Sequence, residues 1–316
     1  MYKKSNLIER PKPLTLSEFH KKRNSICLWH EMGGLGDVLM HRMLFENIKN
    51  LDNSLHVTFA CLPEYMDVAK DHPYIDCVVD SKKLNANDFG MVYNTCVTIA
   101  DRYENSIAPF CKEHRSDLWA KVCGMELSNH EMHFNFDEKI LNKCRTKLKE
   151  LSKNPDKPII IFSPISKMAT KSLLPHQIQA VFEATKEVNL IGIHKTDIQE
   201  LKKLNVPVLN NIEIKEWMCY VAAADYVISV DSAVFHMAGG LKKPLVGIFT
   251  FADGKIYGKY FDFILVQKHR DNGNWDCGPC FKFCNCPKST KIQKPCLTEI
   301  TAEEIKNGIS LMFKKW

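Results

Sequence analysis

The chain has no long apolar stretch. A helix needs about 20 consecutive apolar residues to cross a bilayer, and no window of the 316 residues meets that requirement. This excludes a helix that spans a membrane. The first 23 residues, MYKKSNLIERPKPLTLSEFHKKR, also lack the apolar core of a secretory signal peptide. We therefore expect a cytosolic protein.

Other patterns are missing as well. The sequence has no internal repeat at a solenoid period and no low-complexity tract, so a repeat architecture is not expected. The composition is that of an ordinary globular protein, with 45% hydrophobic and 25% charged residues. A length of 316 residues accommodates two domains of roughly 150 residues each.

The net charge of +6 is unevenly distributed. Residues 1–30 contain seven basic and two acidic residues, residues 31–150 contain 14 and 19, and residues 151–316 contain 22 and 16. A cationic second half suits a polyanionic ligand such as a diphosphate or a nucleic acid. Solvated surface lysines would produce the same balance, so the charge alone defines no site.

The 13 cysteines fall into two groups. Most stand singly in apolar runs, which is typical of small buried side chains, and disulfides are uncommon in a cytosolic chain. Five others lie within one short segment, and its CxxC start together with the later cysteines provides enough thiolates for a tetrahedral zinc or iron site. Reduced free thiols and disulfides remain alternatives. The five are Cys277, Cys280, Cys284, Cys286 and Cys296.

Short apolar runs alternate with helical patterns along the chain, which predicts parallel sheets with right-handed crossovers. The polar segment SKNPDKP at 152–158 separates two such halves. We therefore predict an α/β protein in which two doubly wound Rossmann-like domains, 1–151 and 152–316, face each other across a cleft. Strands are expected at 26–30, 56–60, 77–79, 91–93, 159–162, 189–193, 226–230 and 245–249. Helices are expected at 38–48, 117–124, 139–151, 175–186, 197–204, 214–223 and 234–240.

Ligands of such sheets bind beyond the carboxyl ends of the strands, and three motifs follow strands. The first is HEMGGLGDVLMH at 30–41. Gly34 and Gly36 let a ligand approach the backbone closely, and Asp37 opens a helix whose N-terminus favours anions. A plain N-cap role for Asp37 is an alternative. The run lacks the full GxGxxG spacing, which disfavours a Rossmann dehydrogenase.

The second and third motifs lie in the second half of the chain. SPISKMATKSLLP at 163–175 combines hydroxyls with lysines after a strand, which suits a diphosphate clamp, although a solvated loop would look similar. VDSAVFHMAGG at 230–240 places a polar pair after a buried strand, where helix capping is the simpler explanation. The candidate donor-binding residues are Ser163, Lys167, Thr170, Lys171, Asp231, Ser232, Ala233 and His236.

The run VDSAVFHMAGGLKKPLVGIF resembles the signature of the heptosyltransferase-like glycosyltransferases, family nine. Ala233 stands where the family usually has glycine. GLGDVLM resembles the family's GD element, TKSLLP its K-x-W-P element without the aromatic residue, and CGPCFKFCNCPKSTKIQKPCLTEITAEEI its cysteine-containing ending. The four landmarks follow the family's order and together cover most of the chain.

This resemblance implies a GT-B fold and an inverting transfer that needs no metal for catalysis. Domain 1–151, with its basic arm, would bind the acceptor, and domain 152–316 would bind a nucleotide-diphosphate sugar, with an ADP-type donor and a heptose-like sugar favoured. Asp37 would be the general base, while Lys171 and the Asp231–Ser232 turn would stabilise the leaving diphosphate. Segment 277–296 would form a finger with structural zinc or iron on Cys277, Cys280, Cys286 and Cys296, with Cys284 as an alternate ligand.

The acceptor stays open at this stage. A lipopolysaccharide core sugar is the commonest acceptor in the family, a protein side chain fits the cysteine finger, and a modified DNA base fits the basic arm. Nonspecific DNA binding would weaken steeply with salt. A nucleotide-binding module without catalysis is the alternative from another functional class, and Ala233 is the residue that motivates it.

Overall fold

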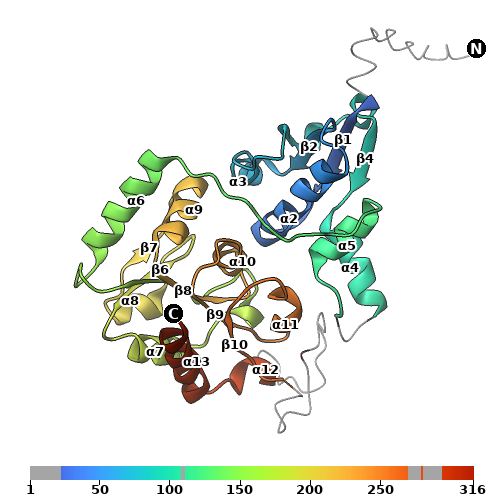
Figure 1. Cartoon of the computed structure of the whole chain (residues 1–316). Coiled ribbons are helices and arrows are strands. Elements are labelled where there is room, and N and C mark those ends of the chain that lie inside the picture. The colour runs from blue at the N-terminus through green and yellow to red at the C-terminus, as the bar shows by residue number, and fades with distance from the viewer. Residues whose placement is uncertain (1–22, 108–110, 270–278, 280–293) are drawn as a thin grey trace, which may run out of the picture.

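The computed structural model describes residues 23–107, 111–269, 279 and 294–316, which form two separate parallel β-sheets (Figure 1). The first sheet contains β1 (Ser25–Trp29), β2 (His56–Cys61), β3 (Cys77–Asp80) and β4 (Met91–Asn94). Their order is β3-β2-β1-β4, and all neighbours are parallel. Strand β1 is central, with Ile26 paired to Val57 on one side and to Met91 on the other.

The second sheet is larger. It contains β5 (Ile159–Ser163), β6 (Asn189–Ile193), β7 (Val208–Leu209), β8 (Tyr226–Val230), β9 (Leu245–Ile248) and β10 (Ile264–Val266). The order β10-β9-β8-β5-β6-β7 is that of a Rossmann sheet. Strands β5 and β6 are buried throughout, as expected for apolar runs covered on both faces of a parallel sheet. The prediction of an α/β fold with parallel sheets is confirmed.

Helices connect the strands of both sheets. In the first half they are α2 (Leu35–Leu51), α3 (Met66–Ala69), α4 (Val97–Ser106), α5 (Arg115–Val122) and α6 (Glu138–Leu151). In the second half they are α7 (Pro175–Ala184), α8 (Gln199–Lys203), α9 (Ile214–Ala223), α10 (Ala233–Gly240), α11 (Gly254–Tyr257), α12 (Pro295–Thr298) and α13 (Ala302–Lys315). Short 3₁₀ turns lie at Pro63–Tyr65, Ser81–Lys83, Ala86–Asp88 and Ala169–Lys171.

Several observed elements differ from those expected from the sequence or were not expected at all. The helix expected at 38–48 begins already at Leu35. The sequence pattern did not predict helix α4, because Val97, Thr98 and Ile99 at its start are β-branched residues, which favour strands. Strands β7 and β10 are too short to show any periodicity.

Helix α6 packs with the second sheet, although it precedes the expected boundary at residue 152. It lies along α9, where Lys143 Nζ is 2.5 Å from Glu216 Oε1 and Cys144 Sγ is 3.7 Å from the Glu216 carbonyl oxygen. Figure 1 shows the two helices side by side. The chain therefore crosses between the two units in segment 123–137, and α6 belongs to the second unit by packing.

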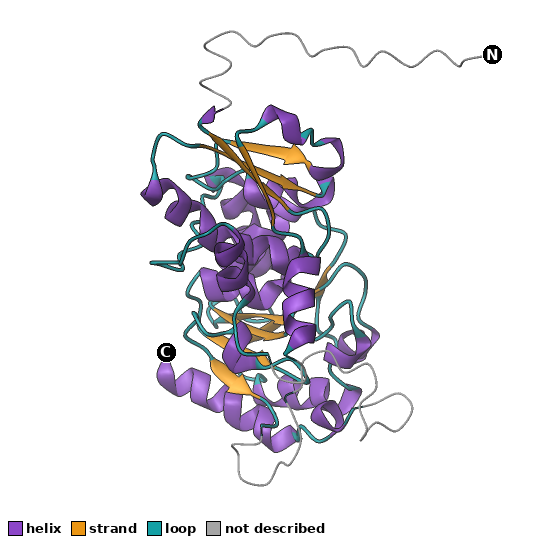
Figure 2. Ribbon diagram, turned by 90° about the vertical axis from the view of Figure 1, so that its right-hand side faces the viewer, coloured by secondary structure: helices purple, strands orange, loops and turns teal. Residues whose placement is uncertain are grey.

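This crossing segment is held against α2. The buried Arg42 donates from Nε to the Met132 carbonyl oxygen at 2.8 Å and pairs with Asp71 Oδ1 at 2.7 Å. Helix α2 also packs against α10 of the second unit, and helices fill the space between the two sheets (Figure 2). Among the described residues, no helix is long and apolar enough to cross a membrane.

Candidate active site

The candidate site lies at the carboxyl ends of the central strands of both sheets. The strand order reverses between β1 and β4 in the first sheet and between β5 and β8 in the second. Loops diverge at such positions and leave a crevice in which ligands bind. A cavity of about 1360 Å³ opens between the two units here, lined by residues from both.

All the residues outside the cysteine segment that the motifs singled out line this cavity. They come from the last residue of β5 and from the loops and helices that directly follow β1, β5 and β8, so parallel strand ends bring them together. Their individual roles stay predictions. The residues are Gly34, Gly36, Asp37, Ser163, Lys167, Thr170, Lys171, Asp231, Ser232, Ala233 and His236.

Asp37 is the third residue of α2, and Gly34 is the N-cap, so the N-cap interpretation of Asp37 is wrong. The Gly34 amide donates to Asp37 Oδ2 at 2.8 Å, which holds the carboxylate at the positive end of the helix dipole. Gly33 has a φ of +147°, and a Cβ there would lie 2.4 Å from His30 Nε2. Only glycine fits this turn.

Asp37 is paired with Arg115 of α5. Arg115 Nη1 donates to Asp37 Oδ1 at 2.6 Å, and the same guanidinium binds Glu104 of α4 through Nε at 2.8 Å and Nη2 at 2.9 Å. Burial alone would raise the pKa of Asp37, but the Arg115 charge and the Gly34 amide reverse this effect and lower it. Asp37 is therefore ionised at neutral pH.

Lys171 and Asp231 meet on the opposite wall. Lys171 Nζ lies 2.6 Å from Asp231 Oδ2. Ser232 is the N-cap of α10 but makes no side-chain cap, and its Oγ instead lies 3.0 Å from Ser229 Oγ. The first residues of α10 line the cavity. An uncapped helix N-terminus beside a lysine suits an anion such as a diphosphate.

The starts of α2 and α10 touch each other at the floor of the cavity. A Cβ on Gly36 would lie 3.1 Å from His236 Cδ2 and 3.9 Å from Ala233 Cα. Burial lowers the pKa of His236 to about 4, so its ring is neutral at pH 7. Glycine at position 36 thus allows the walls to approach within van der Waals contact.

The model of the family "glycosyltransferase family 9 (heptosyltransferase)" matches residues 109–282, which is more than half of the chain. The chain belongs to glycosyltransferase family 9. The resemblance stated from its motifs is confirmed. Membership in this family supports the prediction that the protein is a glycosyltransferase that uses a nucleotide sugar. No curated protein sequence matches the chain.

Solved structures of glycosyltransferases share the fold. The iron-containing dodecameric glycosyltransferase TibC from enterotoxigenic E. coli H10407 has a TM-score of 0.70 at 15% identity, over 93% of this chain and 79% of TibC. A family 9 glycosyltransferase from Veillonella parvula DSM 2008 gives 0.68 at 13%, over 93% and 98%. The E. coli heptosyltransferase WaaC with ADP gives 0.60 at 12%, over 92% and 98%.

Several residues of this family 9 site were not predicted from the sequence. Arg115 contacts Asp37, Glu104 contacts Arg115 and Tyr257 contacts Glu104 only through tertiary packing, and no local motif marks these three residues. An apolar patch of the cavity lining was also missed, because its members are separated along the chain. The patch consists of Ile193, Ile212, Ile214 and Trp217.

Of the predicted metal ligands, the structure describes only Cys296. Cys277, Cys280, Cys284 and Cys286 lie outside the described residues, and so does most of the predicted finger 277–296. Cys296 is described and is buried on α12. Among the described residues, no group of three or more His, Cys, Asp or Glu side chains is arranged to hold a metal.

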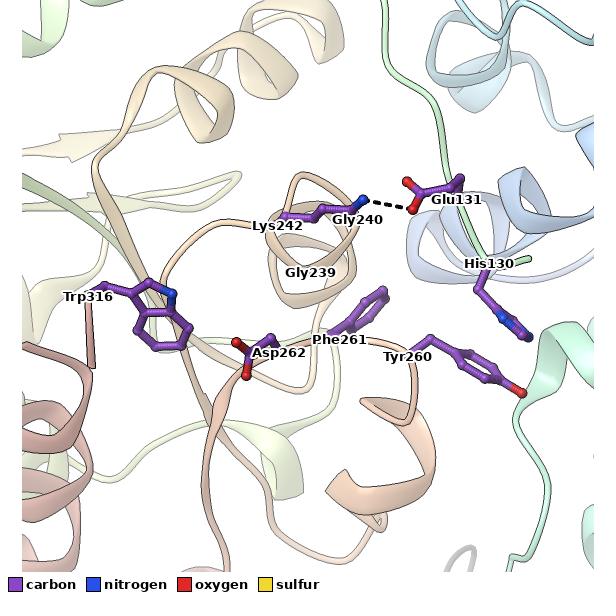
Figure 3. Close-up of a pocket in the computed structure, with 9 residues that line it drawn as sticks. All are labelled: His130, Glu131, Gly239, Gly240, Lys242, Tyr260, Phe261, Asp262 and Trp316. Atoms are coloured by element: carbon purple, nitrogen blue, oxygen red, sulfur yellow. Dashed lines mark hydrogen bonds and ion pairs between the residues drawn. The ribbon is translucent and has the colours of Figure 1, made fainter. Parts of the chain in front are cut away.

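A second cavity of about 510 Å³ lies where the crossing segment meets the second unit (Figure 3). Its charged side chains are engaged with protein partners: Lys242 Nζ is 2.7 Å from Glu131 Oε1, and Asp262 pairs with Lys315. The His130 ring stacks on Tyr260 with centroids 3.3 Å apart. None of the predicted site residues lines this cavity, and its contacts join the two units of the family 9 fold.

Proposed function

We propose that the protein is an inverting glycosyltransferase of the GT-B type. It moves a heptose-like sugar from a nucleotide-diphosphate donor to an acceptor hydroxyl, and the transfer needs no metal. Asp37 is the general base, and the cavity between the two units holds both substrates. The two parallel sheets with a cavity at their facing strand ends support the GT-B arrangement.

The observation that carries this proposal is the opposite character of the two cavity walls. The wall from the second unit is cationic, since Lys167, Lys171, Lys195 and Lys294 line it. The wall from the first unit holds the carboxylate of Asp37, ionised and fixed by two hydrogen bonds. An anionic donor binds to the cationic wall of the second unit, and Asp37 on the wall of the first unit serves as the base.

The donor diphosphate is placed at Lys171 and the start of α10. There, a charged side chain and backbone N–H groups stabilise the charge that develops on the leaving group. The nucleobase then reaches the apolar patch at Ile193 and Trp217, where an aromatic side chain offers a stacking surface. ADP in the WaaC structure supports an adenosine nucleotide, which we extend to this chain as part of the proposal.

Transfer then occurs in one displacement. The acceptor hydroxyl oxygen attacks the anomeric carbon from the face opposite the diphosphate, and the hydroxyl proton moves to a carboxylate oxygen of Asp37. The bond from the anomeric carbon to the diphosphate oxygen breaks, and its electrons leave with the nucleoside diphosphate. Both Asp37 oxygens already accept a hydrogen bond, but each keeps a lone pair for the proton.

The acceptor wall favours an uncharged or cationic acceptor. Glu64 and Asp101 line it together with Asp37, and the guanidinium of Arg115 is engaged with Asp37, Glu104 and Asp101. A phosphorylated saccharide or a DNA backbone would meet repulsion from these carboxylates. This supports a protein side chain or a neutral sugar over DNA, and DNA binding that is absent at about 50 mM salt would eliminate the DNA alternative.

A structural zinc or iron in the C-terminal finger belongs to the proposal as well. Cys277, Cys280, Cys286 and Cys296 would hold it, with Cys284 as the alternate ligand. The iron in TibC supports a metal of this kind. The role is to stabilise a loop, and no step of the transfer passes through the metal.

Incubation with a panel of nucleotide sugars, read by mass spectrometry as donor hydrolysis and transfer, tests the function. The wild-type protein should consume one donor class, and Asp37→Asn should reduce turnover by about 10²–10⁴-fold at unchanged donor affinity. Native turnover in Asp37→Asn would refute the base assignment. Donor binding without any turnover would instead support the non-catalytic module.

A further inference from the structure

Arg115 joins Asp37 to a residue of the opposite wall. Its guanidinium contacts Asp37 on one side and holds Glu104 through two hydrogen bonds on the other. The Glu104 side chain has no exposed surface. Tyr257 of α11, in the second unit, donates from its hydroxyl to Glu104 Oε1 at 3.1 Å. A continuous chain of contacts therefore crosses from the donor wall to the carboxylate of Asp37.

We propose that Arg115 is the positioning residue for Asp37, and that Tyr257 fixes Arg115 from the donor wall through Glu104. This inference rests on the proposed function, in which Asp37 is the base. Tyr257, Glu104 and Arg115 do not touch the reacting atoms in this scheme. They act by aligning the carboxylate that does.

The shape of the guanidinium explains why it suits this role. Its donors form a rigid planar fork, so two bonds to Glu104 fix the direction in which the remaining donor reaches Asp37. A base displaced by about 1 Å loses on the order of 100-fold in rate. Tyr257 belongs to the second unit, so its hydrogen bond to Glu104 requires the two cavity walls to be close together. The carboxylate of Asp37 is therefore aligned in this arrangement of the two units.

The charges around Asp37 single out Arg115. The titratable side chains that interact with Asp37 are His30, His41, Tyr65, Arg115 and His236. Asp101 and Glu104 contact Arg115 instead, and Tyr257 contacts Glu104. Burial lowers the pKa of His30, His41 and His236, so these rings are neutral at pH 7. The positive charge that holds the Asp37 carboxylate ionised therefore comes from Arg115.

Substitution of Arg115 separates charge from geometry. Arg115→Lys keeps the charge but loses the fork, so kcat should fall about tenfold while donor Kd and the acidic limb of the pH–rate profile stay in place. Arg115→Met loses both, so kcat should fall about 100-fold and the acidic limb should move to higher pH. Arg102→Met, an exposed arginine on α4, is the matched control and should behave like the wild type. If Arg115→Met does not fold, Arg115→Lys alone decides, and a native kcat in it overturns the proposal.

Two tyrosines test the link across the units. Tyr257 and Tyr260 both donate a hydroxyl from the second unit to a carboxylate of the first, Tyr260 to Asp117 Oδ2 at 2.6 Å. Only the bond from Tyr257 reaches Asp37 through Glu104 and Arg115. Tyr257→Phe should therefore lower kcat about three- to tenfold at unchanged donor Kd, whereas Tyr260→Phe should leave kcat native. Equal kcat values in the two variants would overturn the role of Tyr257.

A titration that needs no turnover separates this proposal from the function itself. The ¹³C signals of labelled aspartate carboxyls, with Asp37 identified by its loss in Asp37→Asn, report the midpoint directly. The midpoint should rise in Arg115→Met, rise less in Tyr257→Phe and stay native in Tyr260→Phe. If the wild type transfers no sugar, the proposed function fails while this order of midpoints still supports the positioning chain. Identical Asp37 midpoints in the wild type and all the variants would overturn the proposed positioning role of Arg115 and Tyr257.

Discussion

Lys171 Nζ lies 2.6 Å from Asp231 Oδ2, and the pair joins the loop after β5 to the loop after β8. Both loops leave neighbouring strands at the point where the strand order reverses. The contact presents a cation to the cavity beside the start of α10 and fixes its position. An anion that binds at this helix therefore meets a lysine that is already oriented.

Replacement of Lys171 by methionine should weaken ADP binding by about 10- to 100-fold. A charge-assisted hydrogen bond contributes about 1.5–3 kcal/mol, and each 1.4 kcal/mol changes Kd about tenfold. Calorimetric titration with ADP measures the change, and Lys186→Met on an exposed surface is the control. A Kd within about twofold of the wild type would contradict the diphosphate role of Lys171.

Gly33→Ala should destabilise the protein, whereas Gly34→Ala should not. At Gly33 the φ of +147° and a Cβ contact of 2.4 Å with His30 Nε2 both oppose a side chain. At Gly34 a Cβ would meet only Asp37 Oδ2, at 3.8 Å, with an ordinary φ of −100°. We expect a loss of about 1–3 kcal/mol in the free energy of unfolding for Gly33→Ala, measured by urea denaturation. Equal stabilities of the two variants would show that the turn relaxes without strain.

The contrast between Asp37 and Arg115 shows what the sequence could predict about the site. Asp37, Lys171 and Asp231 each follow a strand in a local motif, so topology alone places them at one edge. Arg115 begins α5, and no pattern around it points to the site. Its role follows from packing between α4, α5 and α2, which no short stretch of sequence encodes.

For the fold as well, the sequence predicts elements that have a strong local pattern and misses those that depend on tertiary contacts. Strand β5 is a buried apolar run, and its predicted range of 159–162 differs from the observed one by a single residue. Strand β10 lies in a run too short to be identified. Helix α13 did carry a signal, since Thr301 and Glu304 form a capping box through hydrogen bonds of 2.8 and 3.1 Å. The placement of α6 against α9 depends on tertiary contacts and could not be predicted from its amphipathic pattern.

The five clustered cysteines between 277 and 296 predict a bound metal. Full-length protein should contain about one equivalent of zinc or iron, measured by elemental analysis with and without chelator. Cys280→Ser should lower that content strongly, because a tetrahedral site needs its four ligands. Cys77→Ser, a cysteine of β3 far from the cluster in sequence, serves as the control. Less than about half an equivalent in the wild type would eliminate the metal.

The stability of the protein should fall between about pH 6.5 and pH 3, in part through His114. This residue is the N-cap of α5, and its Nδ1 accepts from the Ser116 amide at 3.2 Å. Burial lowers its pKa to about 3 from the ordinary 6.5. The folded state therefore binds this proton less readily than the unfolded state. The stability that the neutral ring contributes is fully present above pH 6.5 and is lost as the pH falls toward 3.

His114→Asn isolates this contribution. Asparagine is a good N-cap, so the hydrogen bond to α5 is kept while the titrating ring is removed. The slope of unfolding free energy against pH near pH 5 should decrease by up to about 1.4 kcal/mol per pH unit, the value for one proton. His176→Gln, an exposed histidine at the start of α7, should leave the slope unchanged. Because buried His72 and His236 also have lowered pKa values, part of the acid sensitivity should persist in His114→Asn. An unchanged slope in His114→Asn would mean that the ring is not held neutral in the folded protein.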